Sequence, residues 1–290
     1  MKDTKKAVKK YERISPTAWF TAEGRTFSDI PYSREIFAAM EKMGAPSELL
    51  TTFDKPIRFC RFEARYKIIN KYLHDSGNVQ ILELASGLSP RGLLMAENNA
   101  SVNYVEVDLP AMLEQKKAVL ALIKPSLPEN LHLEEGNALK LEELRTATRH
   151  FDKKKSIAVI HEGLLRYLSF EEKIEVGRNI ATLLREFGGV WITPDITLSS
   201  RVHGGQIVEQ TKRITGVDIT ANTFKDVDEA KRFFEGLGFS VEAHSFLEVK
   251  NQLVSPPKIG VSDNELEKTL DGYVFVMRLK KGHSGKIVMR

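Results

Sequence analysis

The sequence predicts an α/β fold with a doubly wound, mostly parallel seven-stranded sheet and a helical cap at its N-terminal end. Two observations lead to this prediction. From Val79 onward, short apolar runs alternate with helical segments, a pattern typical of βαβ units. The first apolar run ends in a turn of small residues, where an open parallel sheet binds its ligands.

Residues 1–75 contain helical and loop segments without an alternating strand pattern. Pro31, Pro46 and Pro56 divide this region into short pieces, and helices are expected at 33–43 and 61–73. We therefore predict an N-terminal helical cap over 1–75 and the sheet domain over 76–290.

The sheet domain contains apolar runs of strand length, separated by helical segments. Ser169 and Glu172 have the spacing of a capping box and predict a helix over 169–187. A hairpin-like pair of strands is expected at the C-terminal end. The expected strands are 79–84, 102–107, 131–136, 156–163, 188–195, 239–246 and 272–279, and other helices are expected from Pro110, over 139–150 and over 227–237.

Composition restricts the class of protein. The 290 residues are 42% hydrophobic and carry a net charge of +4, which is ordinary for a globular enzyme. A single cysteine, Cys60, excludes an internal disulfide framework and a cysteine-based zinc site, so no metal is expected. No apolar stretch is long enough for a membrane span, and no signal peptide is recognisable, so the cytoplasm is the expected location. The basic ends are interpreted as solvated tails, and nucleic acid is not the expected partner.

The turn after the first strand runs from Glu83 to Gly92 and is the first candidate binding element. Gly87 lets the backbone approach a ligand closely. Ala85 and Pro90 occupy the first and third positions where a G-x-G-x-x-G loop has glycine. The turn therefore favours an uncharged nucleoside with an amino-acid tail over a pyrophosphate.

Asp108 ends the second strand and is the second candidate binding residue. A carboxylate at this point can accept hydrogen bonds from both hydroxyls of a ribose, in NAD or in S-adenosylmethionine. A helix N-cap before Pro110 is the alternative interpretation, and it stays open at this stage.

Several segments together resemble the leucine carboxyl methyltransferase family, including its bacterial branch of polyketide-type O-methyltransferases. The resemblance covers about 14–195. The most specific segment is the Glu-Gly-Leu-Leu-x-Tyr-Leu pattern after the fourth strand. The segments are ISPTAWFTAEGRTFSDIPYSREIF, RFEARYKIINKYL, ILELASGLSPRG, YVEVDLPAMLEQK and VIHEGLLRYLS.

The resemblance implies a Rossmann-like class I methyltransferase that uses S-adenosylmethionine. Arg25, with Arg61 or Arg65, would hold the carboxylate of the methionine moiety, because the guanidinium fork matches a carboxylate. Glu162 would lie near the sulfonium, Gly87 beneath the methionine part and Asp108 at the ribose. Further cofactor contacts are expected from Glu83, Ala85, Leu109, Asn137 and Ala138.

The chain departs from the family pattern at two places. The family has a glycine-rich first turn that ends in Asp-Thr-Arg, whereas this chain has Ala85 and the sequence Ser-Pro-Arg at 89–91. Asn137 stands where the family often has an Asp that reads the adenine amino group. An amide oxygen accepts the same hydrogen bond with less charge assistance, so cofactor affinity is affected more than cofactor identity.

Tyr167 and His161 are the candidate catalytic residues. Tyr167 would face the substrate, with a core aromatic as the alternative interpretation. A carboxylate acceptor needs no base, whereas a hydroxyl acceptor does, and His161 is the candidate for that role. A packed histidine is the alternative, since adjacent strand residues such as His161 and Glu162 point to opposite faces.

The methyl acceptor is expected to be a small molecule, with a protein C-terminus as the second option. The polar interval around 196–224 is expected to cover the substrate, and its Arg201, Lys212 and Arg213 could receive an acidic group. Two rival functions stay open: an NAD-dependent oxidoreductase, and a non-catalytic cofactor- or RNA-binding protein that retains the fold.

Overall fold

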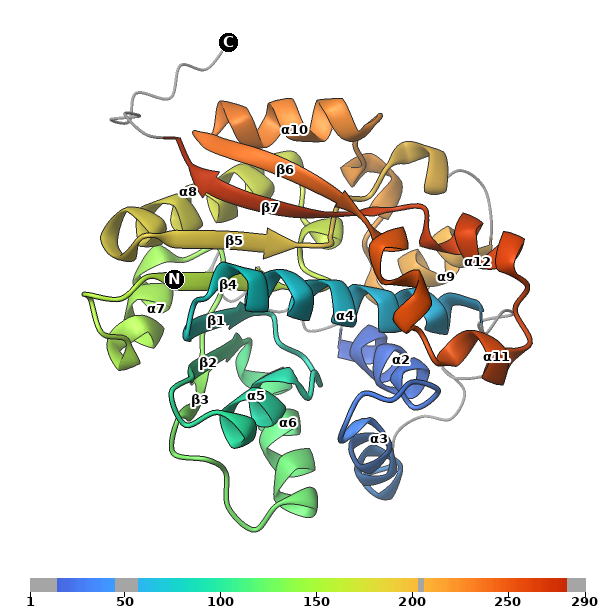
Figure 1. The fold of residues 1–290 in the computed structure, drawn as a ribbon, viewed down its shortest axis with the longest axis horizontal. Coiled ribbons are helices and arrows are strands. Elements are labelled where there is room, and N and C mark those ends of the chain that lie inside the picture. The colour runs from blue at the N-terminus through green and yellow to red at the C-terminus, as the bar shows by residue number, and fades with distance from the viewer. Residues whose placement is uncertain (1–14, 45–56, 203–205, 281–290) are drawn as a thin grey trace.

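A computed structural model describes residues 15–44, 57–202 and 206–280 of the chain (Figure 1). Its described part contains one seven-stranded sheet with the order β3-β2-β1-β4-β5-β7-β6. The strands are β1 (Gln80–Leu84), β2 (Asn103–Asp108), β3 (Leu131–Glu135), β4 (Ile157–His161), β5 (Gly189–Thr193), β6 (Phe239–Ser245) and β7 (Tyr273–Leu279). Every strand expected from the sequence is thus present, with bounds that differ by at most two residues at each end.

The sheet is mixed, not purely parallel. Strands β1 to β5 pair in parallel, whereas β7 is antiparallel to both β5 and β6. The β6 and β7 pair begins with Phe239 opposite Leu279 and ends with Ser245 opposite Tyr273. The expected hairpin-like pair is therefore present, and β7 inserts between β5 and β6. The strand order changes direction between β1 and β4, which places the ends of these strands at the switch point where open sheets bind ligands.

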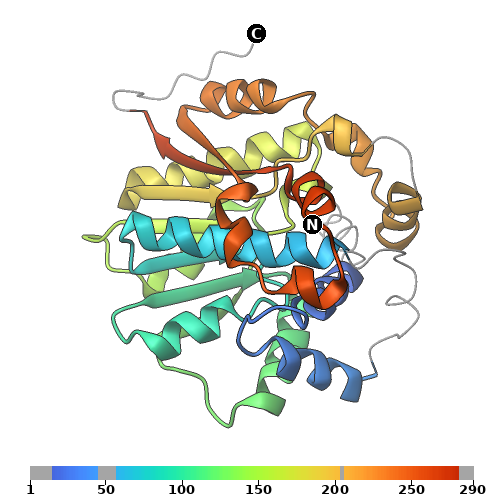
Figure 2. The same ribbon diagram turned by 45° about the vertical axis from the view of Figure 1, so that its right-hand side comes forward.

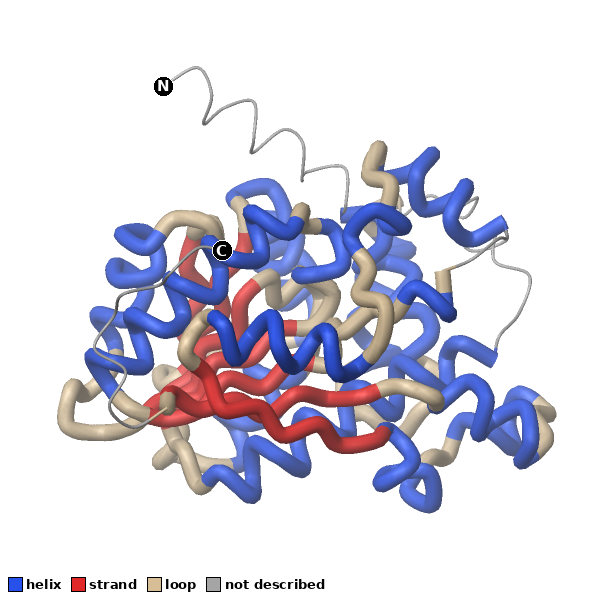
Figure 3. The backbone as a smooth tube through the Cα atoms, turned by 90° about the horizontal axis from the view of Figure 1, so that it is seen from above, coloured by secondary structure: helices blue, strands red, loops and turns tan. Residues whose placement is uncertain are grey.

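Helices cover both faces of the sheet, which explains why the strand sequences are almost continuously apolar (Figures 2 and 3). One face packs against α4 (Ile57–Ser76), α5 (Arg91–Asn98), α6 (Pro110–Ile123) and α12 (Asp263–Leu270). The other face packs against α7 (Leu141–Ala147), α8 (Phe170–Phe187) and α10 (Val227–Gly236). Ser169 and Glu172 form the predicted capping box at the start of α8.

The N-terminal helices α2 (Ser15–Arg25) and α3 (Ser33–Lys42) pack on each other, and they contact α4 and α6 respectively. The helix α4 contacts β4, β5 and β7 directly, so it forms part of the layer that covers the sheet. The division of the chain at residue 75 stays a prediction, and its segments 1–14 and 45–56 lie outside the described residues.

The interval after β5 has little sheet character. It contains η4 (Ser199–Arg201), α9 (Gln206–Thr215) and η5 (Ile219–Asn222), and a single bridge joins Leu198 to Phe224. It is followed, after β6, by η6 (Phe246–Gln252) and α11 (Ser255–Ile259), while η2 (Thr148–His150) and η3 (Leu165–Tyr167) flank β4. Within the described ranges, no helix has the length and apolarity needed to cross a membrane, and no group of residues could hold a metal ion.

Candidate functional site

The ends of β1 and β2 are joined through the Asp108 carboxylate. One oxygen of Asp108 accepts the backbone N–H of Gly87 at 2.7 Å, and the other accepts the N–H of Leu109 at 2.8 Å. Burial raises the pKa of Asp108, and these two hydrogen bonds oppose that rise. Both Ala85 and Gly87 have a φ of 50°, which is unusual for alanine and brings the backbone of this turn close to Asp108. Each carboxylate oxygen retains a further lone pair, so Asp108 can still accept hydrogen bonds from a ligand.

Glu83 has a structural role in the described residues, and its contact with the cofactor stays a prediction. Its carboxylate pairs with the Arg91 guanidinium at 2.6 Å and accepts the Tyr104 hydroxyl at 2.7 Å. Burial alone would lower the pKa of Arg91, but the charge of Glu83 reverses this and holds it above its ordinary value. Glu83 is 1% exposed and Arg91 is fully buried. Since Glu83 lies at the end of β1 and Arg91 at the start of α5, their ion pair connects the two ends of the first turn.

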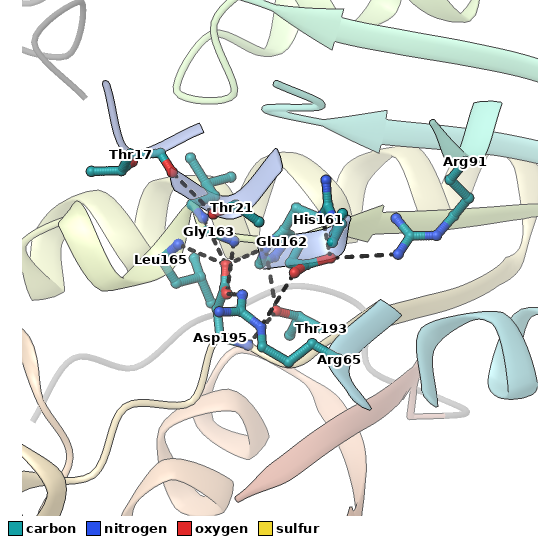
Figure 4. Close-up of polar contacts among 12 residues, drawn as sticks. Thr17, Thr21, Arg65, Arg91, His161, Glu162, Gly163, Leu165, Thr193 and Asp195 are labelled. Atoms are coloured by element: carbon teal, nitrogen blue, oxygen red, sulfur yellow. Dashed lines mark hydrogen bonds and ion pairs between the residues drawn. The ribbon is translucent and has the colours of Figure 1, made fainter. Parts of the chain in front are cut away.

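Glu162, directly after β4, is the centre of an arginine cluster (Figure 4). The Oε2 atom lies 3.2 Å from Nη2 of Arg25 and 3.5 Å from Nη2 of Arg91, while Oε1 lies 3.6 Å from Nε of Arg65. Burial raises the pKa of Glu162, but the three guanidinium groups outweigh it and lower the value. The structure therefore brings together Arg25, Arg65 and Glu162, and it adds Arg91, whose part in the site the sequence reasoning missed.

The second acid of the site is Asp195, which the sequence reasoning also missed. One oxygen of Asp195 pairs with Nη2 of Arg65 at 2.6 Å and accepts the N–H of Gly163 at 2.8 Å. The other accepts the N–H groups of Leu164 and Leu165. Burial raises the pKa of Asp195, but the hydrogen bond with His161, the charge of Arg65 and the N–H of Gly163 lower it far below its ordinary value. Asp195 thus fixes the loop that carries Glu162.

His161 is a buried residue that contacts Asp195. Its ring is fully buried, its Nδ1 lies 3.0 Å from Asp195 and 3.2 Å from Thr193, and it packs beside Trp191. These contacts position Asp195, and Nε2 of His161 has no hydrogen-bond partner among the described residues. A catalytic role of His161 stays a prediction.

Arg61 does not join the arginines at Glu162. Its Nη1 donates to the backbone carbonyls of Thr269 and Asp271 at 2.8 and 3.1 Å, and its guanidinium lies over the Phe246 ring. Arg61 therefore attaches α4 to the chain before β7. Of the two residues proposed to accompany Arg25, the structure places only Arg65 at the site.

Tyr167 connects three parts of the chain. It is 6% exposed, its hydroxyl donates to Thr17 Oγ1 of α2 at 3.2 Å, and its ring packs with Val202, Val217 and Ile219. The interval expected to cover the substrate is thus packed on Tyr167, next to the loop that carries Glu162. The core interpretation of Tyr167 describes its packing, and its hydroxyl still faces the N-terminal helix.

The remaining cofactor residues lie at the ends of β2 and β3. The side-chain oxygen of Asn137 accepts the N–H of Leu139 at 2.9 Å, so its orientation is fixed by its own turn. The neighbouring Ala138 is buried, and its carbonyl accepts the side chain of Asn179 at 3.0 Å. A contact of Asn137 or Ala138 with adenine stays a prediction.

Charged residues expected in the interval after β5 pair with acids. Lys212 pairs with Asp218 at 3.2 Å, whereas Arg201 pairs with Asp271.

Comparison with known proteins supports the family resemblance. The family model described as leucine carboxyl methyltransferase matches residues 46–181, which confirms the resemblance over that segment. None of the curated proteins compared with the chain matches it.

One solved structure shares this fold, and two others resemble it more distantly. A DUF574 family protein from Streptomyces avermitilis superimposes with a TM-score of 0.55 at 15% identity, over 91% of this chain and 97% of that one. A candidate O-methyltransferase from Nostoc punctiforme gives 0.46 at 14% identity, over 87% of this chain and 61% of that one. Human N-acetylserotonin methyltransferase in complex with S-adenosylmethionine gives 0.46 at 12% identity, over 84% and 62%. This chain spans less than two thirds of the length of the last two proteins.

Proposed function

We propose that this chain, whose residues 46–181 match the leucine carboxyl methyltransferase family, is an S-adenosylmethionine-dependent methyltransferase that acts on an oxygen of a small molecule. One observation supports this proposal above all others. Arg25 and Arg65 approach the same buried carboxylate, Glu162, at the edge of the sheet where Asp108 holds the turn of Gly87. An amino acid joined to a nucleoside has the charges and the hydroxyls that suit these groups.

Buried atoms without hydrogen-bond partners fit the amino-acid part of such a cofactor. Among the described residues, Nε of Arg25 and Oε1 of Glu162 are buried and make no hydrogen bond. A carboxylate of the cofactor would bind the Arg25 fork, and an ammonium would bind Oε1 of Glu162. Both new contacts would be charge-assisted, and they would supply the partners that these atoms lack.

Asp108 fits the nucleoside part. Its two oxygens each accept one backbone N–H and are 2.7 and 2.8 Å from those donors, so the carboxylate is oriented before any ligand binds. Ribose hydroxyls would occupy the remaining lone pairs. The fixed geometry reduces the ordering cost of binding.

The acceptor would meet the cofactor between Glu162 and Tyr167. Bound S-adenosylmethionine would supply an activated methyl group, and the chain itself would contribute orientation and exclusion of water. Because His161 is buried and contacts Asp195, it is poorly placed to act as a base, and an acceptor that needs no base fits best. We therefore favour a carboxylate over a hydroxyl as the methylated group, and a small molecule over a protein C-terminus.

The experiment that tests this function measures binding before any acceptor is known. Calorimetric titration with S-adenosylmethionine, S-adenosylhomocysteine and NAD should show micromolar binding of both sulfur nucleosides and none of NAD. Binding of NAD alone would favour the oxidoreductase, and binding of none would favour a non-catalytic protein. Incubation with methyl-labelled cofactor and a panel of aliphatic and aromatic carboxylates should then yield base-labile methyl esters, whereas base-stable products would point to hydroxyl acceptors.

A further inference from the structure

A second group of arginines lies next to the arginine cluster of Glu162, and neither the family match nor the cofactor site explains it. The helix α4 carries Arg58, Arg61 and Arg65 at intervals of three and four residues, so the three share one face of the helix. Arg65 belongs to the Glu162 cluster. Arg58 and Arg61 continue the row from there toward the start of α4.

Two further arginines approach this row from the loops after β4 and β5. Arg166 follows the loop of Glu162 and lies with its guanidinium 5.5 Å from the centre of the Tyr167 ring. It is close enough to Arg58 and Arg61 to repel both of them electrostatically. Arg201, from η4, repels Arg61 in the same way. Burial, together with this repulsion, lowers the pKa of Arg58 to about 10.

Arg61 and Arg201 both contact Asp271. Asp271 pairs with Arg201, and its side chain is 63% exposed, so it is a partly solvated counter-ion. Arg61 donates to the carbonyls of Thr269 and Asp271, which carry no net charge. In the part of the chain that the structure describes, Nε of Arg166 and Nε of Arg201 are buried without a hydrogen-bond acceptor, whereas Nη2 of Arg201 is paired with Asp271. Such unsatisfied cationic donors are costly unless an anion completes them.

We propose that Arg166 and Arg201 form an anion subsite that binds a non-reacting carboxylate or phosphate group of the methyl acceptor. That the bound anion belongs to a methyl acceptor rests on the proposed function, whereas the anion subsite itself depends only on the arginines. Arg61 is not part of the subsite, because its guanidinium is already bonded to backbone carbonyls. The location beside Tyr167 and the interval after β5 places the bound group between the cofactor loop and the segment that covers it. The acceptor would therefore be at least dianionic if its methylated group is a carboxylate.

The test uses inorganic phosphate as the probe for this subsite. The full-length protein is titrated with phosphate in a calorimeter at constant ionic strength, with and without saturating S-adenosylhomocysteine. Arg166→Gln and Arg201→Gln should each weaken phosphate binding by about tenfold, since each removes a charge-assisted contact. Asp271→Asn should have the opposite effect and tighten binding severalfold, because it removes the competing carboxylate of Arg201. Arg232→Gln, on the exposed side of α10, is the matched control and should change nothing.

The outcomes separate the subsite from the proposed function. Phosphate binding that is equal in the wild type and in both arginine variants would overturn the subsite, as would no binding at all. Unchanged binding in Asp271→Asn would contradict the assignment of Arg201. If S-adenosylhomocysteine binds and phosphate does not, the proposed function stands and the subsite fails. If phosphate binds with the expected pattern but S-adenosylhomocysteine does not, the subsite stands and the proposed function fails.

Discussion

Asp108 and Gly87 are joined by a 2.7 Å hydrogen bond from the glycine N–H to the carboxylate, and this bond connects the end of β2 to the turn after β1. The carboxylate thus orients the turn and presents its remaining lone pairs on the ligand side. Of the two alternatives raised from the sequence, the helix N-cap is wrong, because the N-cap of α6 is Leu109 and no side chain caps this helix. Ribose binding by Asp108 stays a prediction.

Replacing Asp108 by Ala should weaken binding of every ligand that contains the ribose. We expect the dissociation constants of S-adenosylhomocysteine and of 5′-methylthioadenosine to rise together, by an amount equivalent to about 1 to 3 kcal/mol. Calorimetry measures both. Asp228→Ala, an exposed acid on α10, is the control. Unchanged affinities in Asp108→Ala would remove the ribose assignment.

Glu162→Gln should weaken binding of the amino-acid tail of the cofactor while leaving binding of its nucleoside unchanged. The variant keeps the shape of the side chain but loses the charge that would bind the ammonium, and it leaves three arginines without their shared counter-ion. We expect the affinity for S-adenosylhomocysteine to fall about tenfold or more, and the affinity for 5′-methylthioadenosine, which has no amino-acid tail, to change by less than about twofold. An equal loss for both ligands would instead indicate that the loop of Glu162 had collapsed.

The contrast between Arg61 and Arg65 shows where sequence reasoning ends. The two residues are four apart on α4 and share one face of the helix, so their spacing cannot distinguish a cofactor ligand from a structural residue. The segment before β7 makes the difference, because Arg61 donates to the carbonyls of Thr269 and Asp271. These residues are 208 and 210 positions from Arg61 in the sequence. Such tertiary contacts leave no local signal.

Local signals did predict much of the rest. The apolar runs gave the strands, and Ser169 and Glu172 gave the start of α8, because both depend on neighbours in sequence. The approach of Arg25 to Glu162, 137 residues apart, followed only from the family resemblance. Asp195 was missed because an acid after a strand is common, and its bonds to the loop at 163–165 depend on the pairing of β4 with β5.

Arg61→Gln should reduce stability without affecting the cofactor. Loss of two hydrogen bonds to carbonyls and of the contact with the Phe246 ring should lower the free energy of unfolding by about 1 to 3 kcal/mol. Chemical denaturation measures this change, with Arg232→Gln as the surface control. The affinity for S-adenosylhomocysteine should stay within about twofold of the wild type. A loss of affinity without a loss of stability would restore Arg61 as a cofactor ligand.

Lys173 should make the stability of the protein depend on pH in the alkaline range. Its ammonium is 1% exposed and donates to the carbonyls of Leu168 and Asn222 at 2.6 and 2.9 Å, which ties α8 to η5. Burial lowers the pKa of Lys173 from 10.5 to about 8, against the opposing charges of Glu172, Glu171 and Asp195.

The sign of the effect follows from which state holds the proton. Above about pH 8 the folded protein releases the Lys173 proton, whereas the unfolded chain keeps it until about 10.5. Because the unfolded state then binds more protons, the contribution of Lys173 to stability rises with pH across this range, by at most about 1.4 kcal/mol per pH unit. Urea denaturation from pH 7 to 10 should show that the free energy of unfolding of the wild type increases relative to that of Lys173→Met as the pH rises. A difference that stays constant with pH would mean that the two carbonyls keep the ammonium charged in the folded protein.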